Sequence, residues 1–260
     1  MSESDWRRRH YIVCILVPWL TAGIVAMIGL LANRSPATIG LTLHDLTPNA
    51  SKQIVLFIVV GFVVVFLMTV AIHFVGPKVV KQIRHKMPRF VQALPHTTHE
   101  RLIFLLVALT AGICEEILFR GFGIAYIKWL WSGANRISII VIVGIAFGLA
   151  HYRQGRPTVA FAGIAGGVFG WMTLATGTLL PAIVVHCLVD IRASFFPAEL
   201  TEPVHPRVFN QGESTLLLHQ SEPSAEPGTV ISTSPETSPA GIVRYVPKPG
   251  KPLNSDPTDS

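Results

Sequence analysis

Long apolar segments dominate this chain and restrict what it can fold into. Tyr11–Ala32 and Ile54–Val75 contain no Asp, Glu, Lys or Arg, and about 20 apolar residues are enough for a helix to span a bilayer. The whole chain agrees with this reading, since 50% of its 260 residues are hydrophobic, 14% are charged and the mean hydropathy is +0.50. These values are typical of an integral membrane protein.

Four further apolar segments follow, each interrupted by Gly, Pro, His or charged residues. They are Leu102–Ile127, Ile137–His151, Thr158–Thr176 and Leu179–Phe196. We expect them to be helices of one bundle, some of them broken or shorter than the bilayer. The predicted fold class is all-α, a polytopic transmembrane helix bundle with about six to eight membrane helices.

Basic residues flank the first two apolar segments. Arg7, Arg8 and Arg9 precede the first, and six Lys and Arg side chains between Lys78 and Arg101 follow the second. The positive-inside rule places both regions in the cytoplasm. The first segment has the basic-then-apolar order of a signal peptide without a small-x-small cleavage site, so we expect a retained signal anchor. The predicted location is the inner (plasma) membrane of a bacterium, with the lipid bilayer as a partner.

The positive net charge does not indicate a nucleic-acid partner. It amounts to +6, but the basic residues border apolar runs and do not alternate with aromatic residues. Membrane topology explains them, and no nucleic acid is expected.

Composition divides the chain into three parts. Residues 1–101 hold the two N-terminal transmembrane helices and the basic cytoplasmic loop, and residues 102–196 hold the interrupted apolar segments. Residues 197–260 are rich in Pro, Ser and Thr. We expect this last part to be a disordered tail, because it has too few apolar residues to form a core.

Five acidic or histidine side chains lie within the apolar part from 102 to 196. They are Glu115, Glu116, His151, His186 and Asp190. A charged group at bilayer depth costs a few kcal/mol, so such residues face a bundle interior or a water-filled cavity and are commonly functional. Their distribution over three segments predicts one site.

Helical geometry separates the two glutamates. Glu116 and Arg120 are spaced i,i+4 and can form an ion pair on one helix face. Glu115 is rotated by about 100° from Glu116, and the residue four positions later is Phe119. We therefore expect Arg120 to neutralise Glu116, which leaves open a purely structural pair, and Glu115 to face a cavity.

The histidines can be placed in the same way. His151 closes the sequence FGLAH one turn after Phe147, and His186 opens HCLVD one turn before Asp190. A His and an Asp at this spacing can orient one another or ligate a metal together. The simpler alternative is that each histidine is a hydrogen-bonded interior residue.

Hydrolysis is the chemistry that these groups could support. A glutamate in a low-dielectric pocket can take a proton from water, and imidazoles can stabilise an oxyanion or hold a Zn²⁺ that does so. Serine-hydrolase chemistry is disfavoured because the chain contains no G-x-S-x-G, and H-E-x-x-H is also absent. Cys14, Cys114 and Cys187 lie in apolar stretches, where a thiol has little thiolate character.

Three short motifs in the order EEILFR, FGLAH and HCLVD resemble those of the CAAX prenyl protease and bacteriocin-processing family of intramembrane proteases. The resemblance covers about 102–196 and rests on E-E-x-x-x-R, F-x-x-x-H and H-x-x-x-N/D. It implies a helical bundle with a CAAX-protease-like catalytic core whose cavity opens toward the cytoplasm. It also implies an endopeptidase that cleaves a membrane-associated peptide or protein.

The resemblance implies roles for six residues. Glu115 would activate water, Glu116 and Arg120 would support it, and three further residues would stabilise the oxyanion or complete the site: His151, His186 and Asp190. If a metal such as Zn²⁺ is bound, its ligands would be Glu115, His151, His186 and Asp190, and a metal-free mechanism is the other expectation. Asp190 stands where the eukaryotic enzymes have Asn, which adds a negative charge and favours metal binding.

Two other classes of function stay open at this point. One is a catalytically silent membrane scaffold or immunity protein of the same fold. Glu115 argues against it, because Glu115 has no local partner and a scaffold would have little reason to bury it. The other is a proton-coupled transporter that uses Glu115, His151 and Asp190 as a relay. The chain lacks the paired broken segments in two repeated halves that such transporters show.

Overall fold

The computed structural model describes residues 3–32, 35–41, 47–196, 233–237 and 243–247. The chain separates into two compact units, Met1–Pro203 and Val204–Ser260. The first unit contains all five of the acidic and histidine residues singled out in the sequence, and it is described first.

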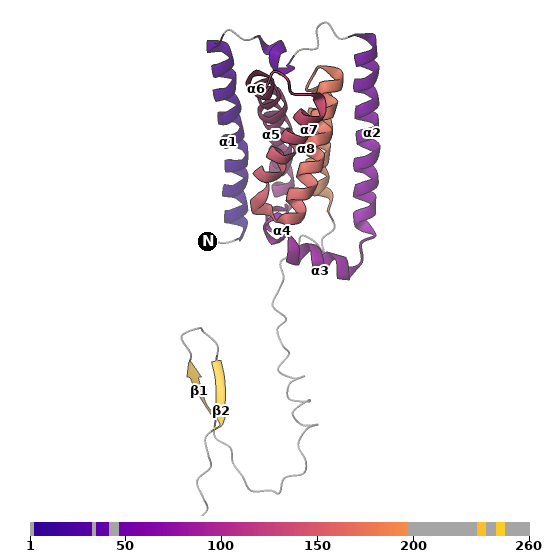
Figure 1. Ribbon diagram of the computed structural model, residues 1–260. Coiled ribbons are helices and arrows are strands. Elements are labelled where there is room, and N and C mark those ends of the chain that lie inside the picture. The colour runs from indigo at the N-terminus through magenta and orange to yellow at the C-terminus, as the bar shows by residue number, and fades with distance from the viewer. Residues whose placement is uncertain (1–2, 33–34, 42–46, 197–232, 238–242, 248–260) are drawn as a thin grey trace, which may run out of the picture. The chain divides into compact units, whose positions relative to one another are not determined.

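Helices build the first unit (Figure 1). In chain order they are α1 (Glu3–Leu31), η1 (Pro36–Ile39), α2 (Pro48–His73), α3 (Pro77–Lys86), α4 (Pro88–Ala93), α5 (Thr98–Glu116), η2 (Ile117–Phe122), α6 (Gly123–Leu130), α7 (Arg136–Ala150), η3 (Tyr152–Gln154), α8 (Arg156–Thr176), α9 (Leu180–Ile191) and η4 (Arg192–Phe195). Each of the six apolar segments predicted to be helical is helical, which confirms the all-α bundle.

Among the described residues, four helices are long and apolar enough to cross a membrane. They are Ser4–Leu31, Pro48–His73, Thr98–Leu130 and Arg156–Thr176. The third is continuous through α5, η2 and α6, and α7 is apolar but only 15 residues long. The expectation that some helices are shorter than the bilayer is therefore confirmed, with α7 and the 12-residue α9 as the short ones.

One end of the bundle carries the basic residues. Helices α3 and α4 lie there (Figure 1), and Arg89 of α4 donates from Nη1 to the carbonyl oxygen of Arg153 at 3.2 Å. Phe196, the last described residue of this unit, packs with Leu94 and Phe90 at the same end. The positive-inside rule assigns this end to the cytoplasm.

The opposite end is closed by contacts between η1 and the turn before α9. Gly40 accepts hydrogen bonds at its carbonyl oxygen from Leu179 N at 3.0 Å and Thr178 Oγ1 at 3.3 Å. Ile39 lies close to η2, because a Cβ added at Gly121 would be 3.0 Å from the carbonyl oxygen of Ile39. Leu179 and Thr178 are both buried, so this end of the bundle is tightly packed.

Helix α1 is joined to α5 by polar contacts at two levels. Arg7 donates from Nε to Glu100 Oε1 at 2.9 Å, and both side chains are buried. Glu100 also completes a capping box with Thr97 at the start of α5. Further along, Trp19 donates to Thr110 Oγ1 at 3.2 Å. The predicted N-terminal membrane helix is thereby part of the bundle.

Glycines bring α7 and α8 into close contact. Gly144 and Gly148 on α7 face Gly163 and Gly167 on α8, and a Cβ on Gly148 would lie 2.8 Å from the carbonyl oxygen of Val159. Helices in lipid gain little from burying apolar surface against each other, so small residues that allow close packing are a main source of association. This contact holds α7 and His151, which follows its last residue, against α8.

The second unit contains two short strands, β1 (Thr233–Thr237) and β2 (Val243–Pro247), which pair antiparallel. The sequence did not predict these strands, although Val, Tyr and Thr favour extended structure. The rest of the predicted disordered tail lies outside the described residues.

Replacing Gly148 by Ala should destabilise the bundle, because its new Cβ would overlap the backbone of α8. Overpacking of this kind costs about 1–3 kcal/mol, so the Tm of the detergent-purified protein should fall. Gly23→Ala is the matched control, since nothing lies within 4 Å of a Cβ at that position. Equal Tm values for the two variants would contradict the close α7–α8 contact.

Candidate functional site

The helix that carries the two glutamates changes its winding directly after them. Helix α5 ends at Glu116 and continues as η2, a π-helical turn over Ile117–Phe122 that contains Arg120. Wider turns of this kind are rare and are frequently found at functional sites. We did not predict this turn from the sequence.

Glu116 and Arg120 form an ion pair that is fully enclosed by protein. Arg120 Nη1 donates to Glu116 Oε1 at 2.6 Å, and both side chains are 0% exposed. The i,i+4 pairing expected from the sequence is therefore present. The guanidinium also lies over the Phe147 ring, at 4.2 Å from the ring centroid, which stabilises its charge in an apolar interior.

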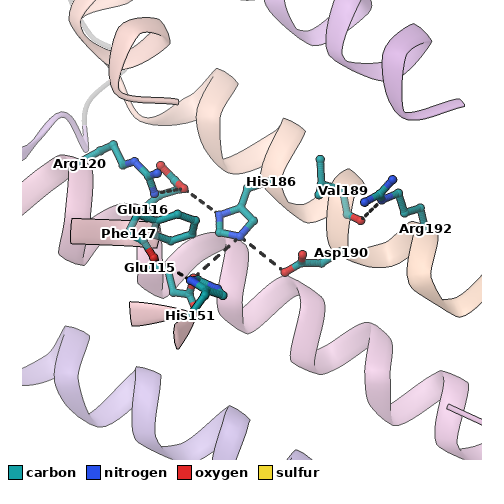
Figure 2. A network of polar contacts seen from close by, with 9 residues as sticks. All are labelled: Glu115, Glu116, Arg120, Phe147, His151, His186, Val189, Asp190 and Arg192. Carbon is teal, nitrogen blue, oxygen red and sulfur yellow. Dashed lines mark hydrogen bonds and ion pairs between the residues drawn. The ribbon is translucent and has the colours of Figure 1, made fainter. Parts of the chain in front are cut away.

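His186 of α9 binds the same carboxylate oxygen. Its Nδ1 lies 2.8 Å from Glu116 Oε1 (Figure 2). Because a carboxylate only accepts hydrogen bonds, this contact places a proton on Nδ1 and turns Nε2 toward the other acidic groups. Two rings hold the imidazole in place, with Phe169 stacked at 5.2 Å and Phe147 edge-on at 5.6 Å.

Glu115 and Asp190 both approach the other nitrogen of His186. Its Nε2 lies 3.9 Å from Glu115 Oε2 and 3.6 Å from Asp190 Oδ2, which is attractive for opposite charges and too long for direct hydrogen bonds. The Glu115 and Asp190 side chains are 26% and 34% exposed, against 6% for His186. Glu115 Oε2 is itself buried and has no hydrogen-bond partner.

His151 approaches the same cluster from the end of α7. Its Nδ1 is 2.8 Å from the carbonyl oxygen of Phe147, so Nε2 is the nitrogen left for other contacts. The ring packs beside Phe147 at a centroid distance of 4.7 Å. His151 acts electrostatically on both Glu115 and Asp190, and Figure 2 shows it on the Glu115 side of the cluster.

The six residues singled out in the sequence are thus brought together from α5, η2, the end of α7 and α9. Sequence analysis missed two features of the arrangement. One is the Glu116 to His186 contact between residues 70 positions apart. The other is Phe169 on α8, for which the sequence carries no signal, because a phenylalanine in an apolar helix is unremarkable.

The donor atoms do not form a ready metal site. Among the described residues, no group of three or more His, Cys, Asp and Glu side chains has the arrangement of metal ligands. The spacings of 3.6 and 3.9 Å around His186 Nε2 compare with about 3.3–3.6 Å between the ligand atoms of a tetrahedral Zn²⁺ whose bonds are about 2.0–2.2 Å. A metal held by Glu115, His151, His186 and Asp190 stays a prediction.

We expect the protein to lose much of its stability when Glu116 is replaced by a neutral residue. Glu116→Gln would leave the Arg120 charge enclosed without a counter-charge, which costs about 3–5 kcal/mol. We expect a clearly lower Tm for this variant and for Arg120→Gln, and partial recovery in the double variant, which buries no net charge. Additive losses in the double variant would contradict a direct pair.

One family model matches the chain, over residues 97–192, and it is described as type II CAAX prenyl endopeptidase Rce1-like. No curated protein and no solved structure matches significantly. The matched residues begin at the capping box of α5, end just after Asp190 and include all six residues of the site. Residues 97–192 of this chain are therefore similar to the Rce1-like type II CAAX prenyl endopeptidases.

Proposed function

We propose that this protein is an intramembrane endopeptidase that hydrolyses a peptide bond in a membrane-associated protein or peptide, with Glu115 as the base. One observation carries the proposal. The carboxylate of Glu115 is part-exposed in an otherwise apolar bundle, faces His186 Nε2 at 3.9 Å and has a buried oxygen without a hydrogen-bond partner. Its neighbour Glu116 also has one unpartnered oxygen, Oε2, but its charge is already taken up by contacts of Oε1 with Arg120 and His186.

In the proposed reaction Glu115 takes a proton from a water molecule, and the water oxygen attacks the carbonyl carbon of the peptide bond. Nε2 of His151 helps to hold that water, since its Nδ1 is engaged by Phe147. The proton on Glu115 then passes to the amide nitrogen as the C–N bond breaks. The products are a carboxylate and an amine, and Glu115 returns to its starting state.

His186 stabilises the oxyanion of the tetrahedral intermediate in this proposal. Its Nδ1 is held by Glu116, which supports the positive charge of the ring when Nε2 also carries a proton. Asp190 Oδ2, 3.6 Å from Nε2, supports the same charge from the other side. Three rigid helices hold these groups, so little reorganisation is needed during the reaction.

Replacement of Glu115 by Gln should abolish cleavage at normal protein abundance. Gln has the same size but cannot accept the proton, and a lost general base reduces the rate about 10²–10⁴-fold. The family description makes a farnesylated peptide with a C-terminal CAAX sequence the first substrate to test. Cleavage is measured by mass spectrometry and abundance by immunoblotting.

Two controls accompany this variant. Cys114→Ala removes the neighbouring thiol and should leave cleavage unchanged, while Glu116→Gln should lower abundance. Normal cleavage by Glu115→Gln would show that the proposed mechanism is wrong. A stable wild-type protein that cleaves none of the membrane-tethered peptides offered would favour the scaffold instead.

We propose a metal-free reaction, and metal analysis tests it. Purified protein should contain far less than one zinc per chain, with no difference between the wild type and His186→Ala. Chelators should leave cleavage unchanged. A stoichiometric metal that disappears in His186→Ala would contradict this part of the proposal.

A further inference from the structure

Arg192 is a basic residue of the bundle that the proposed reaction does not use. It begins η4, directly after α9, which carries His186 and Asp190. Its Nε donates to the carbonyl oxygen of Val189 at 3.0 Å, and its Nη1 lies 3.7 Å from the sulfur of Met68. Because it contacts Val189, the guanidinium lies back along the last turn of α9 (Figure 2).

The groups in direct contact with the Arg192 guanidinium are uncharged. Its guanidinium lies over the rings of Phe161 at 5.5 Å and Phe196 at 5.9 Å. Asp190 acts on it electrostatically, yet within the part of the chain that the structure describes no carboxylate oxygen comes within the 4.0 Å of an ion pair with it. A half-buried cation held only by a carbonyl, a thioether and two rings is incompletely compensated.

The guanidinium also has hydrogen-bonding capacity to spare. It carries five N–H donors, of which Nε and Nη1 have a partner among the described residues. A carboxylate can accept two parallel hydrogen bonds from one guanidinium, which gives both strength and orientation. Contacts with Met68 of α2, Phe161 of α8 and Phe196, which follows η4, hold the side chain in place.

Arg192 lies at a useful distance from the cluster of Glu115 and His186. Arg192 follows His186 by six positions, a rise of about 9 Å along a helix, and the contact with Val189 brings the guanidinium closer. An extended peptide covers about 3.3 Å per residue. A substrate with its scissile bond at Glu115 would therefore reach Arg192 after about one to three residues.

We propose that Arg192 binds the C-terminal carboxylate of the substrate and thereby positions the substrate relative to Glu115. This inference rests on the proposed endopeptidase function and adds the part of the substrate that it recognises. The position of Arg192 among Met68, Phe161 and Phe196 favours a peptide end within the bundle over a lipid phosphate at its surface.

The test compares two forms of one substrate. A farnesylated fluorogenic peptide is prepared with a free C-terminal carboxylate and with a C-terminal amide. For the wild type in neutral-lipid vesicles, amidation should lower kcat/KM about 30-fold, the usual effect of losing a charged hydrogen bond. For Arg192→Gln the free acid should lose about as much, mainly through KM, and amidation should then have almost no effect.

Further variants separate this role from a structural one. Arg192→Lys should keep part of the preference for the acid, and Arg153→Gln should behave as the wild type, since it removes an exposed cation from the η3 turn that follows His151. Equal losses on acid and amide in Arg192→Gln would show that Arg192 only supports the fold and would overturn the inference. An Arg192 effect that appears only with anionic lipid would overturn it in favour of a lipid phosphate.

Cleavage by the wild type distinguishes failure of the Arg192 proposal from failure of the proposed endopeptidase function. Cleavage of both peptides at equal rates, lost in Glu115→Gln, would retain the endopeptidase and overturn the role of Arg192. No cleavage of either peptide by well-folded wild type would overturn both.

Discussion

One carboxylate oxygen, Oε1 of Glu116, joins the parts of this bundle that form the site. It accepts from Arg120 at 2.6 Å and contacts His186 Nδ1 at 2.8 Å, so the α5–η2 helix and α9 are fixed to each other at full burial. A charged group at bilayer depth requires neutralisation, and Arg120 supplies it for Glu116. The position of His186, and with it the geometry around Glu115, depends on this contact.

Small residues allow the helices around that contact to approach. A side chain at Gly112 would collide with Cys187, the neighbour of His186, and a Cβ on Gly166 would lie 3.1 Å from Arg120 Nη2. Polar contacts and glycine packing thus stabilise the same region. Both are expected to stabilise helix association in lipid, because burying apolar surface between helices contributes little to it there.

Much of the fold and part of the site could be predicted from the sequence. The features that could be predicted are local along the chain, and those that could not depend on tertiary packing. Helices in a membrane leave a strong local signal, because every backbone group must be satisfied within its own segment. The Glu116–Arg120 pair follows from i,i+4 geometry alone. The contact of Glu116 with His186, 70 positions away, follows from how α5 and α9 pack, which local sequence does not encode. The π-helical turn at Ile117–Phe122 escaped prediction for the same reason, since tertiary contacts stabilise such turns.

The closure of one end of the bundle by Gly40, Thr178 and Leu179 bears on the protons of the proposed reaction. A cavity open toward the end that carries α3 and α4, as the family resemblance implies, would admit water and substrate to Glu115 from that side. A proton taken up by Glu115 then returns to the aqueous phase from which its water came. Turnover would therefore move no net charge across the bilayer, and the membrane potential would neither drive the reaction nor be dissipated by it.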